Sequence, residues 1–491
     1  MSATLKQTIE DNLGNNQRIE SRQIRPTTAI GTANGSVRWK LPQSGILHHG
    51  AYIQVSMTSA NHDQFLPMGA GILSLVKRAI LYSGNKQIMS VDHANHLMTL
   101  KRQFSSMGQR LQKDCINHGT VDGLMVSDLD LGGAQDDVEK GKLKIDKRQP
   151  NVQYDVLHSQ HIVRPYRLTQ TAATTPLYKI TLAELFPAFL AGLQLPLGLM
   201  RDPVSIVLQW SDDRAGSRTC YKNTTAHATP NLVVEDSLIL FVDLLYYSTP
   251  DGEVGVMESL TDKMNAAGGI AFEYTDVVSV LGSIPAAVPA PAVNTAVKQS
   301  VNRLVGMVGE NLRNLLMSTP VHPLTDATAT NGVDCGNALL GAYCSKACLG
   351  ETTLNVKINN KPVYPLAIGG HGDAQLWDQI SQVYGMPLNV AKAQYSTETW
   401  IDSYAFAGSI AAGVGATNGQ SSMSHQDVED FTNHNFGGQS QYLGVPTQLT
   451  RQNVAGAGIA VGTAPTEVLY TRERTSEDNA VLDFFVFGEC E

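Results

Sequence analysis

Two segments about 275 residues apart in this 491-residue chain have the same local pattern. The first reads SGNKQIMS (83–90) and the second reads INNKPVYP (358–365). In each, an Asn-Lys pair ends a run of strand-forming residues, and a segment with helical spacing follows. Turns of this composition are common before strands, so the two segments alone leave open a chance match or a duplication.

The elements around the two turns favour duplication. In the first half, residues 53–57 alternate between apolar and polar, and 203–210 and 236–247 read as strands. In the second half, 353–358 alternate and 480–489 form a closing strand. Apolar residues at helical spacing follow both turns, at Leu97, Leu100 and Phe104, and at Trp377, Ile380 and Tyr384. The order of elements therefore occurs twice, which predicts one fold built twice.

The length of the chain and the placement of its glycines and prolines agree with two β-rich domains. A chain of 491 residues is too long for one hydrophobic core, and its 43 Gly and 21 Pro fall between short apolar runs. We expect a polar, flexible N-terminal arm over 1–35, a first domain over 36–250 and a second over 251–491. Thr181 and Glu184 predict a capping box on a short helix.

One part of the second half fits this scheme less well. The apolar residues of 297–316 recur at a helical period, although Gly306 and Gly309 weaken a helix and a strand over 303–308 remains an alternative. The preceding segment 284–293, IPAAVPAPAV, predicts an extended surface loop.

The charge of the chain argues against a dedicated nucleic-acid binder. The formal net charge is −9 and only 16% of residues are charged, whereas phosphate binding needs a concentrated basic field. No run reaches the roughly 18 to 20 apolar residues of a membrane span, and the N-terminus has no signal-peptide core. Six cysteines in so long a chain indicate a reducing compartment rather than a disulfide framework.

The strongest candidate for a metal site is the acidic segment DLDLGGAQDDVE. Asp128, Asp130, Asp136 and Glu139 occupy positions 1, 3, 9 and 12 of an EF-hand calcium loop, with Gly133 at the turn position. Gly132 at position 5 supplies no side-chain oxygen and flanking helices are absent, so an acidic surface loop is the alternative.

The other candidate sites are weaker. His158 and His161 lack a third nearby ligand, His48 and His49 lie in an exposed turn, and the cysteines at 335, 344 and 348 provide only one tight pair. Neither a Gly-x-Ser-x-Gly nucleophile motif nor a P-loop occurs. We therefore nominate no catalytic residue and no cofactor, and expect a protein that is not an enzyme.

Several stretches resemble the double jelly-roll major capsid proteins of nucleocytoplasmic large DNA viruses, virophages and polinton-like viruses. The resemblance is one of pattern over most of the chain, and five stretches carry it: VRWKLPQSGILHHGAYIQVSM (37–57), SLVKRAILYSGNKQI (74–88), ITLAELFPAFLAGLQLPLGLM (180–200), LNVKINNKPVYP (354–365) and NAVLDFFVFGECE (479–491). It implies an all-β fold of two consecutive eight-stranded jelly-roll β-sandwiches, with short helices in the connecting loops.

The resemblance also implies a function, a set of partners and a location. Members of this family are structural subunits whose homotrimeric, pseudo-hexagonal capsomers tile an icosahedral virion shell. The implied partners are further copies, minor capsid and penton proteins, and an internal membrane layer, with no sequence-specific nucleic acid. The implied location is the virion capsid, assembled in the host cytoplasm. Long loops at 123–150 and 407–425 would make outward or lateral contacts.

Two alternatives remain open from the sequence. A two-domain β-sandwich protein that binds or cleaves carbohydrate would use aromatic platforms and paired carboxylates, but the four tryptophans (Trp39, Trp210, Trp377 and Trp400) are spread singly. A minor capsid or cement protein of the same fold is the other alternative.

Overall fold

A computed structural model of the chain gives the architecture. The structure describes residues 16–32, 34–58, 64–65, 70–103, 115–118, 177–186, 195–211, 221–222, 232–248, 261–262, 264–266, 268, 275–292, 295–306, 311–320, 322, 351–370, 374–383, 443–447, 459–474 and 481–490.

Eight strands of the first half form two facing sheets. They are β1 (Asn16–Ile24), β3 (Ser36–Lys40), β5 (Tyr52–Val55), β8 (Val76–Ser83), β9 (Lys86–Asp92), β10 (Tyr178–Thr181), β11 (Val204–Trp210) and β14 (Ile239–Ser248). Counted from one to eight along the chain, they lie in the orders 1-8-3-6 and 2-7-4-5 in the two sheets. Two four-stranded sheets in these orders form an eight-stranded jelly roll.

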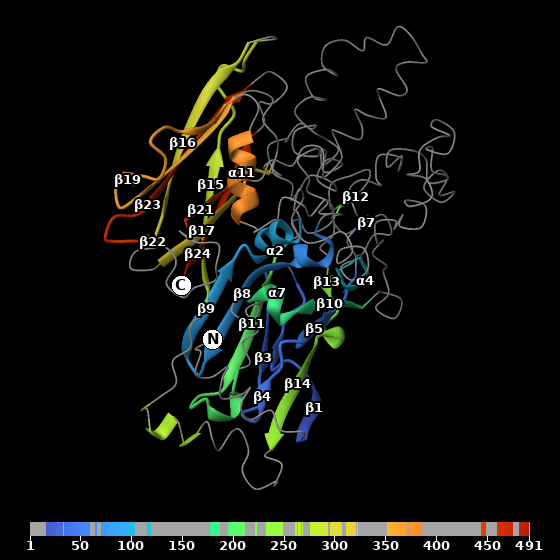
Figure 1. Ribbon diagram of the computed structural model, residues 1–491. Coiled ribbons are helices and arrows are strands. Elements are labelled where there is room, and N and C mark those ends of the chain that lie inside the picture. The colour runs from blue at the N-terminus through green and yellow to red at the C-terminus, as the bar shows by residue number, and fades with distance from the viewer. Residues whose placement is uncertain are drawn as a thin grey trace, which may run out of the picture.

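The second half repeats this arrangement. Its eight strands are β15 (Asp276–Ile284), β16 (Val297–Val305), β17 (Asn311–Ser318), β18 (Thr352–Ile358), β19 (Lys361–Pro362), β21 (Leu443–Pro446), β23 (Thr466–Arg474) and β24 (Leu482–Cys490). Their sheets again have the orders 1-8-3-6 and 2-7-4-5. The predicted fold of two consecutive jelly rolls is therefore confirmed, and the two rolls lie side by side (Figure 1).

The strand order explains why the two Asn-Lys segments resemble each other. Only the connection from the fourth to the fifth strand stays within one sheet, so only this connection can be a tight hairpin. Ser83 pairs with Lys86, and Ile358 with Lys361, which leaves two turn residues in each roll. Gly84 has a φ of 59° in the first turn, and Asn359 and Asn360 have φ of 53° and 63° in the second. Glycine and asparagine are the residues that adopt such values readily.

Short helices and minor strands complete the described elements. In both rolls a ten-residue helix follows the fifth strand: α2 (Ala94–Gln103) in the first roll and α11 (Ala374–Val383) in the second. The others are the helices α4 (Cys115–His118) and α7 (Leu182–Leu185), the 3-10 helices at Gly71–Leu75, Leu197–Leu199 and Glu235–Ser237, and the strands β2 (Thr28–Ala29), β4 (Ile46–Leu47), β6 (Met57–Thr58), β7 (Gln64–Phe65), β12 (Tyr221–Lys222), β13 (Leu232–Val233), β20 (Ile368–Gly370) and β22 (Ile459–Ala460). Among the described helices, none has the length and apolar character to cross a membrane.

The alternation seen in the sequence corresponds to burial in the sandwiches. Leu240, Val242 and Leu244 of β14 are buried on one face, and every second residue of β18 is buried. Trp39 of β3 and Trp210 of β11 are fully enclosed in the first roll. A strand with one face in a core and one in solvent gives this period of two.

The first strand begins earlier in the chain than the sequence indicated. We expected ordered structure from about Ser36, but 16–24 form β1, the first strand of the first roll, which pairs with β14 over its whole length. β1 is polar, so its side chains give no strong strand signal, whereas its backbone hydrogen bonds place it in the sheet. The boundary near 250 lies outside the described residues and stays a prediction.

The helical reading of 297–316 is wrong. Residues 297–305 and 311–318 form strands β16 and β17. Val297, Val301 and Val305 are four residues apart, a spacing that puts side chains on one face of a strand as well as of a helix. Val301 and Val305 are buried in the sandwich. Residues 285–292 lie outside the strands, and Val288 is fully open to solvent, as expected for a surface loop.

Candidate functional site

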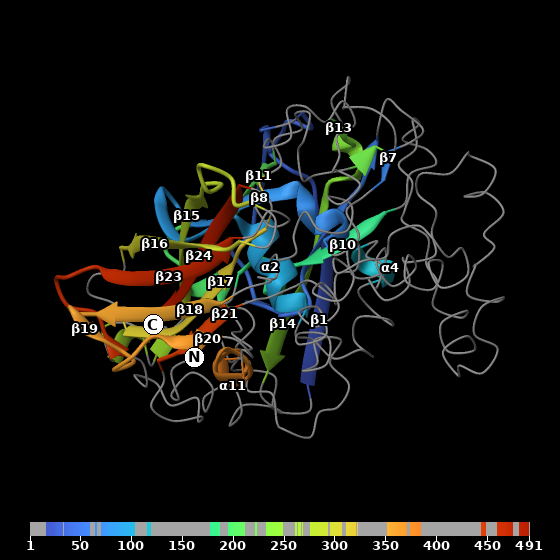
Figure 2. The same cartoon turned by 90° about the horizontal axis from the view of Figure 1, so that it is seen from above.

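The two rolls meet along one surface, which we call the inter-roll seam. Helix α2 lies between the sandwiches in both views (Figures 1 and 2). The seam includes His93, His96, Leu97, Leu100 and Lys101 of the first roll, and Asn314, Leu316, Phe485, Phe487 and Glu489 of the second, and strand β9 of the first roll also lies beside β15 of the second. It fixes how one roll is held against the other.

The second roll contributes strand β24, which is buried on both faces. On the inner face, Phe484 stacks on Tyr470 of β23, with the ring centres 5.4 Å apart. On the outer face, the rings of Phe485 and Phe487 are nearly parallel, 6.3 Å apart. Both outer rings are buried, because this face of the sheet is covered by the first roll. An apolar face of this kind needs such a cover.

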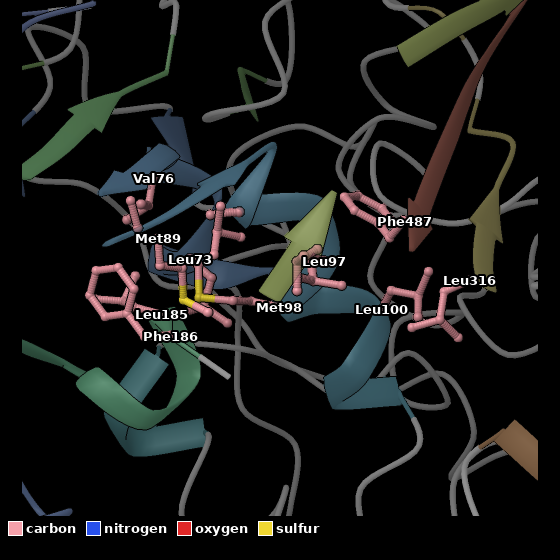
Figure 3. Packing of buried hydrophobic residues seen from close by; sticks show 14 of the residues in the cluster. Leu73, Val76, Met89, Leu97, Met98, Leu100, Leu185, Phe186, Leu316 and Phe487 are labelled. Carbon is pink, nitrogen blue, oxygen red and sulfur yellow. The ribbon is translucent and has the colours of Figure 1, made fainter. Parts of the chain in front are cut away.

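The first roll contributes helix α2, which has apolar side chains on two sides (Figure 3). Met98 points into the core of the first roll. Leu97 and Leu100 point the other way, toward Phe487 and Leu316 of the second roll. The buried residues of the two rolls consequently form one continuous hydrophobic cluster.

Histidines of the first roll pack on the aromatic ring of Phe485. The His96 ring stacks on it at 3.9 Å between centres, and His93 meets it edge-on at 5.1 Å. His96 is buried. These contacts extend the seam beyond α2 to the residue that precedes it.

One ion pair crosses the seam. The Lys101 ammonium lies 2.5 Å from Oε1 of Glu489, and the Asn314 amide donates to Oε2 of the same carboxylate at 3.1 Å. Burial by itself raises the pKa of Glu489, but Lys101, Asn314 and the nearby Arg313 outweigh it and hold that pKa below its ordinary value. The carboxylate is therefore charged at neutral pH, and each of its two oxygens has a partner.

A second titratable cluster lies within the first roll, where the predicted capping box is confirmed. Thr181 Oγ1 accepts from the Glu184 backbone N–H at 3.3 Å, and the Thr181 backbone N–H donates to Glu184 Oε2 at 2.8 Å. His118 Nε2 lies 3.3 Å from the same carboxylate. Burial by itself raises the pKa of Glu184. The opposing effects of His118 and Thr181 together are larger, so the pKa is lowered to about 2.

This lowered pKa predicts an acid-dependent contribution to stability. Because the folded-state pKa of Glu184 is below the ordinary value of 4.5, its contribution is complete above pH 4.5 and is lost as the pH falls toward about 2. We expect the free energy of unfolding of the wild type, relative to Glu184→Gln, to fall by roughly 2–3 kcal/mol over this range. Urea unfolding of both proteins between about pH 2 and 6 measures this difference. Parallel curves for the two proteins would contradict the assignment.

Most of the metal candidates taken from the sequence fall outside the part of the chain that the structure describes. Asp128, Asp130, Asp136 and Glu139 lie outside the described residues, as do His158, His161 and the cysteines at 335, 344 and 348. Within the described ranges, no group of three His, Cys, Asp or Glu side chains is placed to hold a metal ion. The calcium loop stays a prediction.

The described candidates have structural roles. His48 is half-buried, its Nδ1 accepts from the Gly50 backbone N–H at 3.1 Å, and burial lowers its pKa, with a smaller effect from His49. Cys490 is buried at the end of β24. Trp377 is half-buried on α11.

The seam itself was not identified from the sequence, although one signal for it was present. The run LDFFVFG is apolar at nearly every position, and a strand without alternation is covered on both faces. The apolar run of β24 could not reveal that α2 covers it. The sequence of α2 does not show which of its apolar residues face the first roll and which face the second.

Comparisons with known proteins show the fold. No family model and no curated protein sequence matches the chain. The crystal structure of VP54 of PBCV-1, fitted into a cryo-EM reconstruction of the virophage Sputnik, is similar, with a TM-score of 0.50 and 11% identity over 96% of this chain and 94% of that one.

Two other solved structures have lower scores. The cryo-EM structure of the Sputnik virophage has a TM-score of 0.49, with 10% identity over 97% of this chain and 85% of that one. The Faustovirus major capsid protein has a TM-score of 0.47, with 10% identity over 97% and 90% of the two chains.

Proposed function

We propose that this protein is a major capsid protein, a structural subunit that forms pseudo-hexagonal homotrimers tiling an icosahedral virion shell. One observation carries the proposal: the same eight-strand order occurs twice, in a chain that matches VP54 along nearly its whole length. A fold alone does not establish a function. Here the strand order and the seam together suit a building block.

The seam supports the proposal physically. Two rolls that share one hydrophobic cluster and an ion pair form a block with two similar lobes. Three such blocks around a threefold axis present six similar lobes, and a six-lobed ring packs in a hexagonal lattice. Closed cyclic symmetry also buries the lateral surfaces of each subunit.

The proposed partners follow from this role. The protein would contact copies of itself within the capsomer and between capsomers, as well as minor capsid and penton proteins, with an internal membrane layer beneath the shell. The proposed location is the virion capsid, with assembly in the host cytoplasm. The net charge of −9 suits a shell that does not bind the genome directly.

We propose no enzymatic activity. The titratable clusters of the described residues have structural explanations, since Glu184 caps a helix and Glu489 closes the seam. The carbohydrate-binding alternative would need an aromatic platform, but Trp39 and Trp210 are enclosed in the core. A minor capsid or cement protein would have the same fold without forming the capsomer.

The solution mass of the recombinant protein tests the proposal. We expect light scattering on a sizing column to give a trimer, because three chains of 52.9 kDa make about 159 kDa. The trimer should persist on dilution, and negative-stain images should show hexagonal outlines. A stable monomer at all concentrations would contradict the capsomer. Sugar binding on a glycan array, together with a monomeric mass, would favour the carbohydrate-binding alternative.

A further inference from the structure

The two rolls differ at the outer edge of their second strand. In the first roll this strand is β3, and the minor strand β2 pairs with its outer edge, with Thr28 opposite Arg38 and Ala29 opposite Val37. In the second roll it is β16, which pairs with β23 on one side, while no described residue pairs with the other side. β15 is an edge strand too, and it lies beside β16 in the facing sheet. Within the described ranges, the second roll therefore has two neighbouring edges without a covering strand.

Uncovered edges are templates for strands of other molecules. Natural proteins cover such edges or place charged side chains on them that point inward, between the sheets. Arg303 of β16 is a residue of this kind. Val301 and Val305 are buried in the sandwich, and side chains alternate along a strand, so Arg303 points to the same side as these two valines.

The Arg303 side chain crosses from β16 to β15. It packs over Gly282 of β15, where an added Cβ would overlap Nε of Arg303. One terminal nitrogen of the guanidinium donates to the Ser283 carbonyl of β15, and the other donates to the Asn302 carbonyl of β16 at 3.2 Å. One side chain therefore binds the backbone of both edge strands.

The Ser283 carbonyl points to the open edge of β15. In an antiparallel ladder, the backbone groups of successive residues point to opposite sides. Ser283 lies opposite Asp483, whose N–H donates away from β15, to the Pro320 carbonyl at 2.9 Å. Ser283 consequently directs its carbonyl away from β24. Val277, six residues earlier, points the same way, and its N–H donates to the Asp276 carboxylate at 2.8 Å.

The Asn302 carbonyl likewise points to the open edge of β16. Lys298 lies opposite Glu473, whose N–H donates away from β16, to the Glu351 carbonyl at 2.9 Å. Lys298 and, four residues further on, Asn302 therefore direct their backbone groups away from β23. At each edge, Arg303 occupies a carbonyl that an added strand would need.

We propose that Arg303 keeps β15 and β16 from pairing with a strand of a second copy of this chain. Its guanidinium satisfies a carbonyl of each edge and places a charge where the backbone of an added strand would lie. The reason for such protection rests on the proposed function. Antiparallel pairing of one edge strand with its own copy would invert one subunit relative to the other, and subunits joined in this way could not enter a shell in which the same end of every subunit faces outward.

Two variants remove the contact by different routes. Arg303→Met removes the guanidinium, whereas Gly282→Ala leaves Arg303 intact and adds a Cβ where its side chain lies. Gly282 is outside the left-handed region, so alanine adds only this overlap. We expect both variants to aggregate about tenfold faster than the wild type at equal concentration, measured by light scattering and sedimentation.

A matched control and a double variant separate edge protection from general effects. Lys298→Gln removes a positive charge from the same strand, where the side chain is 58% exposed and paired with Glu351, and should leave the rate unchanged. Because Arg303→Met and Gly282→Ala remove one and the same contact, the double variant should aggregate no faster than either single variant. Rates that multiply, or wild-type rates for both single variants, would overturn the proposal.

Hydrogen exchange locates the association. In the aggregates of either variant, we expect the peptides covering 276–284 and 297–305 to gain protection, because an added strand would bond their outward backbone groups. Aggregates without added protection in either peptide would show that association uses another surface, and would contradict the assignment. A wild type that proved to be a monomer would remove the capsomer, but it would leave all of these comparisons unchanged.

Discussion

Replacing Phe487 with alanine should lower the free energy of unfolding by about 4 kcal/mol. The Phe487 ring is fully buried on the outer face of β24, where it packs against Leu97 of helix α2 (Figure 3). Truncation removes most of this apolar contact and leaves a cavity that two rigid sandwiches cannot close. Urea unfolding measures the loss, and calorimetry shows whether the two rolls still unfold together.

Phe484 provides a matched control on the same strand. Its ring is also fully buried, but it faces Tyr470 inside the second roll instead of the seam. Phe484→Ala should cost a similar free energy of unfolding, but only Phe487→Ala should separate the transitions of the two rolls. A loss below about 1 kcal/mol for Phe487→Ala, with a single unchanged transition, would show that the seam does not couple the rolls.

Replacing Lys101 with methionine should cost about 3 kcal/mol at neutral pH. The substitution keeps much of the aliphatic stem and removes the ammonium, so the largely buried Glu489 carboxylate loses its ion-pair partner and keeps only Asn314 and the nearby Arg313. With Lys101 no longer offsetting the effect of burial, the pKa of Glu489 rises, and part of the lost stability should return as the pH falls and the carboxyl group becomes protonated. Urea unfolding over a pH series measures both effects.

The double variant Lys101→Met with Glu489→Gln is the control for charge. It removes both charges and keeps an amide in place of the carboxylate, so it should be more stable at neutral pH than Lys101→Met alone. In the wild type, the lowered pKa of Glu489 means that its contribution is complete above the ordinary glutamate range and is lost at acid pH. Additive effects of the two substitutions would contradict a direct interaction.

Strands with one buried face were the elements that the sequence predicted well. β5, β14 and β18 alternate between apolar and polar residues because one side of each faces a core and the other does not. The two Asn-Lys turns were informative for a topological reason, since each lies at the one connection of its roll that can be a tight hairpin. The capping box at Thr181 was visible because it depends on residues three apart.

Edge strands were harder to predict. β1 carries Arg18, Glu20 and Arg22, and its place in the sheet depends on backbone bonds to β14, which leave no mark on the side-chain pattern. β16 was misread because a spacing of four residues fits a helix and a strand alike. In both cases, pairing with a strand distant in the chain decides the structure.

The seam could be predicted only in part. The apolar run of β24 shows that both of its faces are covered, but the identity of the covering helix depends on how the two rolls meet. The pairing of Lys101 with Glu489 likewise joins residues from opposite halves of the chain. Neither is a local property of the sequence. The candidate calcium loop at 128–139 lies outside the described residues and stays a prediction.

The pairing of first with last strands determines when each roll can be completed during synthesis. β1 pairs with β14, and β15 with β24, so each roll lacks an inner strand of one sheet until its eighth strand has been made. The first roll can close while the second is still being translated. A chain that stopped short of Leu482 would lack both an inner strand and one side of the seam. Incomplete translation products therefore cannot fold into a complete subunit.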